Sequence, residues 1–518
     1  VVYLPSHKSH VDYLVLSFVL YVNALLPPLI AAGENLSFFP LGPILRRGGA
    51  FFIRRSFSGQ KLYAALVDAY MRKLIVEGYG IEFFIEGGRS RTGKLLPPKY
   101  GLLSMVVDAA LLMKTRKVYF APISIGYERI IEERSYVHEL SGGEKQKENV
   151  GGLIEASSGV LRSKYGRLYV QFGEVISFEE LVREILSESV TAPGASAAAM
   201  SPRLRRSLVQ RLAHLVTYRI NEVTVVTPAA LVASALLVHS RKGMTRTELH
   251  EGAAQLLGAL KRQNARIAAT IEGDEGTPRA RTLDEATALF VDARLVVEHQ
   301  NVHGEPVYTI PEERRLALEY YKNTVVHFFV DRGLIAGAML VGGRRIIKES
   351  TLRRRVQELS RAFKYEFMFR ADAEFDRIFE DTLQAMVEQG EIVRAGEHVQ
   401  VAESGEARML PVYVTMLGTY FEAYVLALRG AALLLDGQLA RKEWLRRTLA
   451  MGQRMYLAGE IMRRESLTQH KLETALKSLK DHQLVAFEAN EMLSKGSRVS
   501  SREDLKAYEQ KLTAFLKE

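Results

Sequence analysis

Short apolar runs alternate with longer helical patterns over roughly the first third of the chain. The helical patterns include Gln60–Glu77 and Leu102–Lys114, and the apolar runs are Val1–Leu4, Ala50–Ile53, Ile81–Ile85, Val118–Ile125 and Leu168–Phe172. Runs of this length are typical of buried strands, and their alternation with helices favours a mixed or parallel sheet covered by helices. We therefore predict an α/β domain over residues 1–188.

The pattern changes after this domain. Small residues dominate Thr191–Ala197, which is typical of a linker, here placed at 189–202. Beyond it the chain is mainly α, with short strand pairs around turns at His303-Gly304 and Gly396. Helices followed by a small hairpin suggest winged-helix-like modules. We predict one helical, winged-helix-like module over 203–345 and a C-terminal helical module over 346–518.

One apolar stretch, Leu14–Ala32, is long enough to raise the question of a membrane span. Asn23 and the Pro27-Pro28 pair interrupt it, so a spanning helix is not expected. Two interpretations remain open: an ordinary core helix, or a helix whose flank, with Leu25, Leu26 and Leu29, touches a bilayer interface.

Composition narrows the class of partner. Lys and Arg number 70 against 60 acidic residues, a net charge of +10, which suits an anionic partner such as a lipid surface, an acidic carrier protein or nucleic acid. The chain has no cysteine, which excludes a disulfide framework and a cysteine nucleophile. Its 518 residues are enough for two to four domains.

The segment after the first apolar run contains His7 and Asp12 in an H-x-x-x-x-D spacing. This places an imidazole in a strand-to-helix turn and a carboxylate in the first helical turn, where the helix dipole favours negative charge. The carboxylate can then hold one imidazole tautomer, and His7 can act as a general base toward a hydroxyl. The same residues also fit a capping box formed by Ser9 and Asp12.

Three further blocks follow in the chain. They are Gly49–Arg55, Phe84–Lys94 and Ala121–Glu128, which contain F-I-R-R, E-G-G-R-S-R-T-G-K and P-I-S-I-G-Y-E. Together with the His7 block, and in this order, they resemble the glycerolipid acyltransferase motifs. Their amino-acid sequences are similar to those of bacterial glycerol-3-phosphate 1-O-acyltransferases. The resemblance is dense up to about residue 185 and continues more diffusely through Tyr320–Asn323 and Lys364–Phe367.

The blocks supply candidate site residues. The candidate catalytic residues are His7 and Asp12. The guanidinium groups of Arg55, Arg89 and Arg91 suit a substrate phosphate, because their planar forks bind its oxygens in a bidentate manner. Lys94 is a weaker candidate. A solvated basic loop is the alternative.

Other residues of the blocks have two possible roles. Glu86 either orients Arg89 or caps the next turn, and Ser90 either donates to phosphate or satisfies the turn. Gly87 lets the backbone approach an anion. By resemblance Pro122 shapes the acyl-donor wall, although a structural role fits equally well. Leu95 stands where a nucleotide-binding P-loop needs Ser or Thr, so that alternative is discarded.

The resemblance implies a reaction. It is transfer of a long-chain acyl group from acyl-ACP or acyl-CoA to the sn-1 hydroxyl of glycerol-3-phosphate, without cofactor or essential metal, at an anionic phospholipid surface on the cytoplasmic face of a bacterial inner membrane. A sibling enzyme acting on lysophosphatidic acid or dihydroxyacetone phosphate is the nearer alternative. A winged-helix nucleic-acid-binding protein, using Arg353–Arg355 or Arg441–Arg447, is the distant one, and no nucleic acid is expected.

Overall fold

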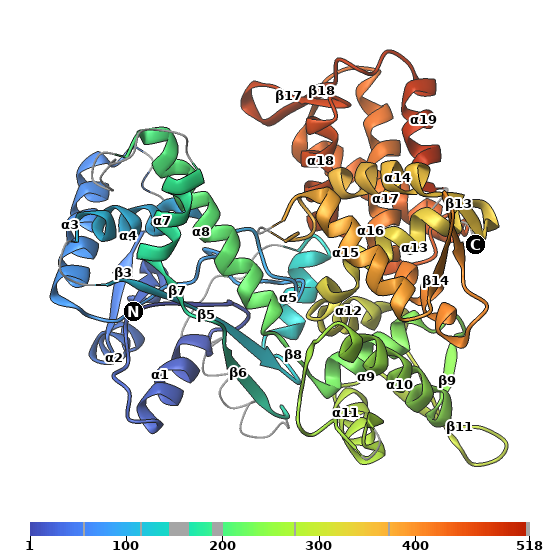
Figure 1. Cartoon of the computed structure of the whole chain (residues 1–518), viewed down its shortest axis with the longest axis horizontal. Coiled ribbons are helices and arrows are strands. Elements are labelled where there is room, and N and C mark those ends of the chain that lie inside the picture. Colours follow the sequence, from blue (N-terminus) through green and yellow to red (C-terminus); the bar gives the residue numbers. More distant parts are fainter. Residues whose placement is uncertain are drawn as a thin grey trace. The chain divides into compact units, whose positions relative to one another are not determined.

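The chain forms two compact units, shown in Figure 1. The computed structural model describes residues 1–54, 57, 59–113, 117–143, 165–188, 200–273, 276–370 and 373–513. Unit 1 comprises Val1–Ser90, Leu95–Glu132 and Gln146–Val225, and unit 2 comprises Arg91–Lys94, Glu133–Lys145 and Val226–Glu518.

This division lies at residue 225, whereas the sequence led us to expect a boundary at 188–203. Helix α8 (Pro202–Glu222) packs on helix α4 (Tyr100–Leu112) and strand β5 (Tyr119–Tyr127), so it belongs to unit 1. Residues 189–199 of the predicted linker lie outside the described part of the chain. The further division at residue 345 stays a prediction.

Unit 1 contains the predicted mixed sheet. Its strand order is β3-β2-β4-β1-β5-β6, and β7 also pairs with β5. The pairs from β3 to β5 are parallel, whereas β6 and β7 run antiparallel to β5. Beside β5, the strands are β1 (Val2–Pro5), β2 (Leu29–Gly33), β3 (Ala50–Ile53), β4 (Ile81–Glu82), β6 (Leu168–Phe172) and β7 (Ile176–Ser177).

Helices cover both faces of this sheet, as Figure 1 shows. Val2 and Leu4 point to one face and pack with α3 (Lys61–Glu77), α4, α7 (Phe178–Glu188) and α8. Tyr3 points to the other face, where Leu16 and Leu20 of α1 (Asp12–Val22) are buried. The period-two alternation along β1 thus builds a core on each side of the sheet. Helix α2 (Leu41–Arg47) packs on β3.

The apolar stretch Leu14–Ala32 is not one helix. Helix α1 ends at Val22, Asn23 follows as its C-cap, and β2 begins at Leu29. The strand lies inside the sheet between β3 and β4, so its apolar character comes from burial on both faces.

Unit 2 repeats one arrangement three times: helix, strand, helix, helix, strand, strand. In each repeat the last strand lies between the other two, giving the sheets β9-β12-β11, β13-β15-β14 and β16-β18-β17, all antiparallel. Each first strand runs directly into the second helix of its repeat. The Thr245–Glu248 capping box fixes this transition in the first repeat.

The elements of the three repeats have the following bounds. The first contains α9 (Pro228–Val238), β9 (Gly243–Thr245), α10 (Arg246–Arg262), α11 (Ala280–Asp292), β11 (Val297–Gln300) and β12 (Pro306–Thr309). The second contains α13 (Val330–Leu340), β13 (Ile346–Lys348), α14 (Glu349–Ala362), α15 (Phe375–Glu388), β14 (Ile392–Ala395) and β15 (His398–Val401). The third contains α16 (Met409–Ala431), β16 (Leu439–Ala440), α17 (Arg441–Leu457), α18 (Gln469–Asp481), β17 (Val485–Phe487) and β18 (Met492–Lys495).

Other elements connect or flank the repeats. They are α5 (Glu133–Leu140), α12 (Arg315–Asn323), α19 (Arg502–Thr513) and the short strand β8 (Val225–Val226), which pairs with β10 (Arg266–Ile267) inside the first repeat. Helix α13 packs on α16, and α12 packs on α9. Two windows in the described part of the chain, Val326–Gly343 and Gly405–Leu434, are long and apolar enough to cross a membrane. They are 61% and 78% buried inside the protein, as in core helices.

Candidate active site

His7 and Asp12 meet at the corner between β1 and α1. The Nδ1 atom of His7 lies 2.9 Å from Oδ2 of Asp12, and the imidazole stacks on Phe84 with ring centroids 3.7 Å apart. The His7 side chain is 15% exposed and that of Asp12 is fully buried. Because Nδ1 faces a carboxylate, it carries the proton, which leaves the lone pair on Nε2.

Asp12 accepts more than this one hydrogen bond. Its Oδ2 also receives the backbone N–H groups of Lys8 at 2.7 Å and Ser9 at 2.8 Å, and the hydroxyl of Tyr127 on β5 donates to Oδ1. The predicted capping box is wrong, because the N-cap of α1 is Val11 and not Ser9, and no described side chain caps this helix end. The carboxylate that faces His7 nevertheless accepts the Ser9 N–H. Helix α1 begins at Asp12 itself.

The loop that follows β4 is bonded to the backbone of His7. The carboxylate of Glu86 accepts from the N–H of His7 at 2.6 Å and from that of Leu96 at 2.8 Å. The N–H of Ser90 donates to the carbonyl of His7 at 2.8 Å. Glu86 thus holds two loops together, and its predicted orientation of Arg89 stays a prediction. These bonds bring the first and third motif blocks to one place.

Arg89 lies near the residues that follow His7, to which Glu132 links it. Its Nη1 atom is 3.6 Å from the carboxylate of Glu132, which also accepts from the Ser9 hydroxyl at 3.0 Å and the His10 N–H at 2.8 Å. The Ser90 hydroxyl is buried and has no hydrogen-bond partner among the described residues. A buried unpaired hydroxyl beside a guanidinium is suited to donate to an anionic ligand.

Burial controls the electrostatics of this corner. It lowers the pKa of His7 below 6.5, although the hydrogen bond to Asp12 opposes the shift, and the charge of Arg89 lowers the pKa further. His7 is therefore neutral at pH 7, as a general base must be. Burial also raises the pKa of Glu86 to about 8 and raises that of Glu82 on β4 well above its usual range. The Asp12 charge adds to both of these increases.

The remaining predicted site residues do not all belong to the His7–Asp12 corner. Gly87 has a φ of +65°, and a Cβ there would meet the side chain of Lys99. Pro122 lies in β5 between the segments that pair with β7 and β6, so its missing N–H falls in a gap of the ladder. Arg91 and Lys94 belong to unit 2. Arg55 lies outside the described residues.

In unit 2 both basic side chains are already paired. Arg91 donates from Nε to Glu139 at 3.1 Å, and the ammonium of Lys94 contacts the carboxylate of Glu366. Lys94 is buried, and burial lowers its pKa while Glu366 opposes the shift. Substrate contact by either residue stays a prediction.

Sequence reasoning missed two residues of the site, Tyr127 and Glu132. Tyr127 stands in the P-I-S-I-G-Y-E block, and its place in that block is the signal that could have identified it. Glu132 lies outside every block, and only the fold brings it to Ser9 and Arg89.

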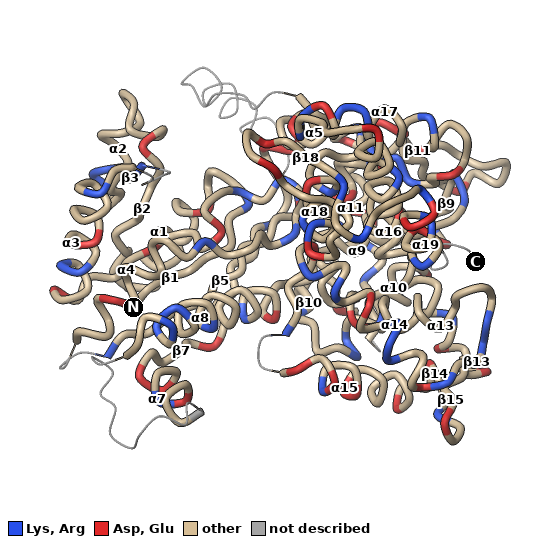
Figure 2. The backbone as a smooth tube through the Cα atoms, turned by 90° about the horizontal axis from the view of Figure 1, so that it is seen from above, with Lys and Arg blue, Asp and Glu red and all other residues tan. Residues whose placement is uncertain are grey.

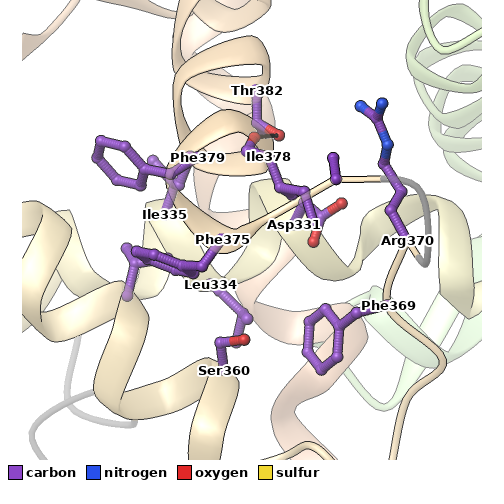
Figure 3. A pocket seen from close by; sticks show the side chains of 12 residues that line it. Asp331, Leu334, Ile335, Ser360, Phe369, Arg370, Phe375, Ile378, Phe379 and Thr382 are labelled. Carbon is purple, nitrogen blue, oxygen red and sulfur yellow. Dashed lines mark hydrogen bonds between the residues drawn. The ribbon is translucent and has the colours of Figure 1, made fainter. Parts of the chain in front are cut away.

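Unit 2 also contains a cavity of about 230 Å³ in its second repeat, shown in Figure 3. The rings of Phe369, Phe375 and Phe379 line it together with the carboxylate of Asp331. Burial raises the pKa of Asp331 to about 6, and the charge of Arg370 opposes this shift. None of the predicted site residues lines this cavity.

The side chains of the described residues can be compared with the requirements of a metal site and of a basic surface. Over the described ranges, no group of three His, Cys, Asp or Glu side chains could hold a metal ion. Figure 2 shows basic and acidic residues interspersed along both units. Many of the arginines are paired, as in the contacts of Arg353 with Asp376 and of Arg446 with Glu443.

Comparisons with known proteins show the family of this chain. Residues 1–126 match the family model Acyltransferase, the class to which the sheet and the His7–Asp12 corner point. Residues 136–488 match the model described as Glycerol-3-phosphate acyltransferase C-terminal region. That match covers more than half of the chain, which therefore belongs to the glycerol-3-phosphate acyltransferase family. The resemblance inferred from the four motif blocks is confirmed.

Two relatives named glycerol-3-phosphate acyltransferase illustrate the similarity. One from Pseudomonas entomophila is 33% identical over 80% of this chain and 49% of its own length. Another from Pseudomonas aeruginosa is 35% identical over 75% of this chain and 45% of its own. The chain thus spans about half the length of the curated relatives it matches. A solved 1-acyl-sn-glycerophosphate (LPA) acyltransferase from Thermotoga maritima matches 42% of this chain and 66% of its own at 15% identity and a TM-score of 0.21, too weak to support an argument.

Proposed function

We propose that this chain carries the acyltransferase site of an enzyme that acylates the sn-1 hydroxyl of glycerol-3-phosphate. The observation that carries the proposal is the hydrogen bond between His7 and Asp12. With Nδ1 donating to Asp12, Nε2 removes the hydroxyl proton as that oxygen attacks the thioester carbonyl. The tetrahedral intermediate then expels the thiolate, which takes the proton from His7. No acyl-enzyme is required.

The acceptor phosphate needs fixed cations and donors. Arg89 and the Ser90 hydroxyl are the proposed partners in unit 1, because both lie within the segment bonded to His7. A guanidinium and a hydroxyl on one short loop suit phosphate oxygens. Arg55, Arg91, Gly87 and the Pro122 wall are carried over from the motif resemblance as further candidates, whereas the ammonium of Lys94 already faces Glu366.

We place the acyl donor, acyl-ACP or acyl-CoA, near a phospholipid surface. Helix α1 exposes apolar side chains on one stripe: Leu14, Phe18 and Tyr21 are 52%, 65% and 72% exposed, and Leu26 beyond the helix end is 90% exposed. The stripe begins next to the His7–Asp12 corner. An exposed apolar stripe of this kind suits an interfacial helix rather than a spanning one. Peripheral attachment to the cytoplasmic face of a bacterial inner membrane follows as the proposed location.

The three repeats of unit 2 have the strand order and helix order of winged-helix modules, and we propose that interpretation for all three. In the second repeat a nucleic-acid role is disfavoured by the charge of the third helix. Helix α15 carries Asp376, Glu380, Asp381 and Glu388 against Arg377 alone, and such a helix repels phosphates. We propose that the modules scaffold the active site or dock a protein partner.

One experiment separates the proposed reaction from the sibling reactions with other acyl acceptors. The protein is reconstituted with phospholipid, and thiol release from a long-chain acyl thioester is followed with three acceptors. Release that requires glycerol-3-phosphate supports the proposal. Release only with lysophosphatidic acid or dihydroxyacetone phosphate assigns a sibling reaction, and no release with any of them contradicts the enzyme proposal.

A further inference from the structure

Four residues of the third motif block, Arg91–Lys94, belong to unit 2, although the residues on both sides of them belong to unit 1. We call these four residues the strap. The motif itself, E-G-G-R-S-R-T-G-K, gives no sign of this change, since it reads as one continuous phosphate loop. Within unit 2 each residue of the strap has its own contact.

The first half of the strap is held by α5 and α12. Arg91 donates to Glu139 at 3.1 Å, and its guanidinium carbon lies 5.3 Å from the ring centroid of Tyr136. The carbonyl of Thr92 accepts from the side-chain amide of Asn323 at 2.9 Å. That amide is buried, and its oxygen accepts from the hydroxyl of Tyr420 at 2.7 Å.

The second half of the strap, Gly93 and Lys94, contacts Tyr320, Glu366 and Tyr420. Gly93 has a φ of +84°, and any Cβ there would overlap the carbonyl oxygen of Tyr320, so only glycine fits. The ammonium of Lys94 contacts the carboxylate of Glu366 and donates to its carbonyl at 3.1 Å. It also lies 4.4 Å from the ring centroid of Tyr420.

Tyr420 is the centre of a buried charge cluster. Lys322 and Lys471 lie 5.7 and 5.4 Å from its ring, and Glu319 accepts from Lys471 at 2.7 Å. Burial lowers the pKa of Lys322 to about 8. Burying several ammonium groups is costly unless every one is paired, and apolar residues would pack as well. Pairing within such a cluster holds its members in defined positions.

Two segments supply much of this contact surface. They are Tyr320–Asn323 and Lys364–Phe367, the two stretches through which the family resemblance continues beyond the catalytic blocks. Neither contains a catalytic motif. Their shared feature in the structure is contact with the strap.

We infer that Glu366, Asn323 and Tyr420 are positioning residues, which anchor the strap and thereby fix Arg91 for the acceptor phosphate. Lys94 is the tether of this anchor and not a ligand of the substrate. The inference rests on the proposed function, because the phosphate is that of the proposed acceptor.

The first test is the KM for glycerol-3-phosphate. Glu366→Met removes the carboxylate that faces Lys94, and Glu391→Met is its matched control, because Glu391 is equally buried and pairs with Arg332 at 2.8 Å away from the strap. Glu366→Met should raise KM by about tenfold or more, since small displacements of positioning groups are costly. Glu366→Gln, whose amide oxygen still accepts from Lys94, should raise it less. An unchanged KM in Glu366→Met, or an equal rise in the control, overturns the anchor.

The second test separates a tether from a substrate ligand. Lys94→Met alone leaves Glu366 buried and unpaired, whereas the double variant Lys94→Met with Glu366→Met leaves an apolar pair that can pack. The double variant should have a lower KM than Lys94→Met. A KM at least as high would mean that the Lys94 charge itself binds phosphate, and would refute the tether.

A third measurement does not depend on turnover. Hydrogen–deuterium exchange of a peptide covering residues 86–95 should rise in Glu366→Met and not in Glu391→Met. An unchanged exchange rate refutes the anchor even if the enzyme is active. Absence of turnover with glycerol-3-phosphate in the wild-type protein would refute the proposed function, while the exchange result still decides the anchor.

Discussion

Replacement of Asp12 by Asn removes one charge from the proposed active site and little else. One side-chain oxygen of Asn can still accept from the N–H groups of Lys8 and Ser9, which Asp12 Oδ2 accepts at 2.7 and 2.8 Å. The amide nitrogen then faces the Tyr127 hydroxyl, which can turn to accept. We therefore expect the variant to fold, with circular dichroism and thermal unfolding close to those of the wild type.

The catalytic loss follows from the missing charge. An imidazolium and a carboxylate whose charge centres are about 4 Å apart attract by about 4 kcal/mol at an effective dielectric of 20. The loss of this attraction lowers the pKa of His7 further, and about 4 kcal/mol is roughly a thousandfold in base strength. Proton transfer is only partial in the transition state, and Asn also permits the wrong tautomer, so kcat should fall by about 10²–10⁴.

The assay is thiol release with saturating acyl thioester and glycerol-3-phosphate. Tyr127→Phe is the graded control, since it removes one hydrogen bond from Asp12 and keeps the charge. That variant should lose about three- to tenfold, as expected for about 1 kcal/mol. A folded Asp12→Asn variant that keeps more than about a tenth of wild-type kcat would refute the proposed role of Asp12.

Three further predictions concern stability and membrane binding. Glu86 keeps its proton up to about pH 8 in the folded protein but loses it near 4.5 when unfolded, so the unfolding free energy should fall as pH rises between these values, by at most about 1.4 kcal/mol per unit. Glu86→Gln should flatten this slope in denaturant titrations from pH 5 to 8, and an identical slope in both proteins would contradict the shift. Gly93→Ala should lower the unfolding midpoint and loosen the strap, whereas Gly405→Ala, where a Cβ meets nothing within 4 Å, should change the midpoint little. Phe18→Glu on the exposed stripe of α1 should weaken sedimentation with anionic phospholipid vesicles, while Val302→Glu, at a still more exposed position in the β11–β12 turn, should not; equal binding by all three proteins would exclude the stripe as the contact.

Local pattern predicted much of unit 1. Strands β3 and β6 have the expected bounds, and α3 and α4 begin and end within two residues of them. Strand β2 was missed because Leu29–Gly33 continues an apolar stretch that starts in α1, and hydrophobicity alone does not separate a buried strand from a helix. The third hairpin of unit 2 was missed for a different reason: its turn uses Asn490 with φ of 55° instead of the glycine found in the other two.

The sequence predicted the part of the site whose residues are close together in the chain. His7 and Asp12 meet because five residues at a strand-to-helix corner allow it. The contacts of Tyr127 with Asp12 and of Glu132 with Ser9 join positions more than 110 residues apart, which only the sheet and its helices bring together. The change of unit at Arg91 has no local signature, since no pattern within E-G-G-R-S-R-T-G-K distinguishes Ser90 from Arg91.

The most direct test of the central claim compares wild-type protein with His7→Ala in phospholipid, using thiol release from a long-chain acyl thioester. The account predicts release that depends on glycerol-3-phosphate and is abolished in a folded His7→Ala variant. Because the pKa of His7 is lowered, wild-type activity should persist somewhat below pH 6.5. Glycerol-3-phosphate-dependent release that survives in His7→Ala would contradict the account.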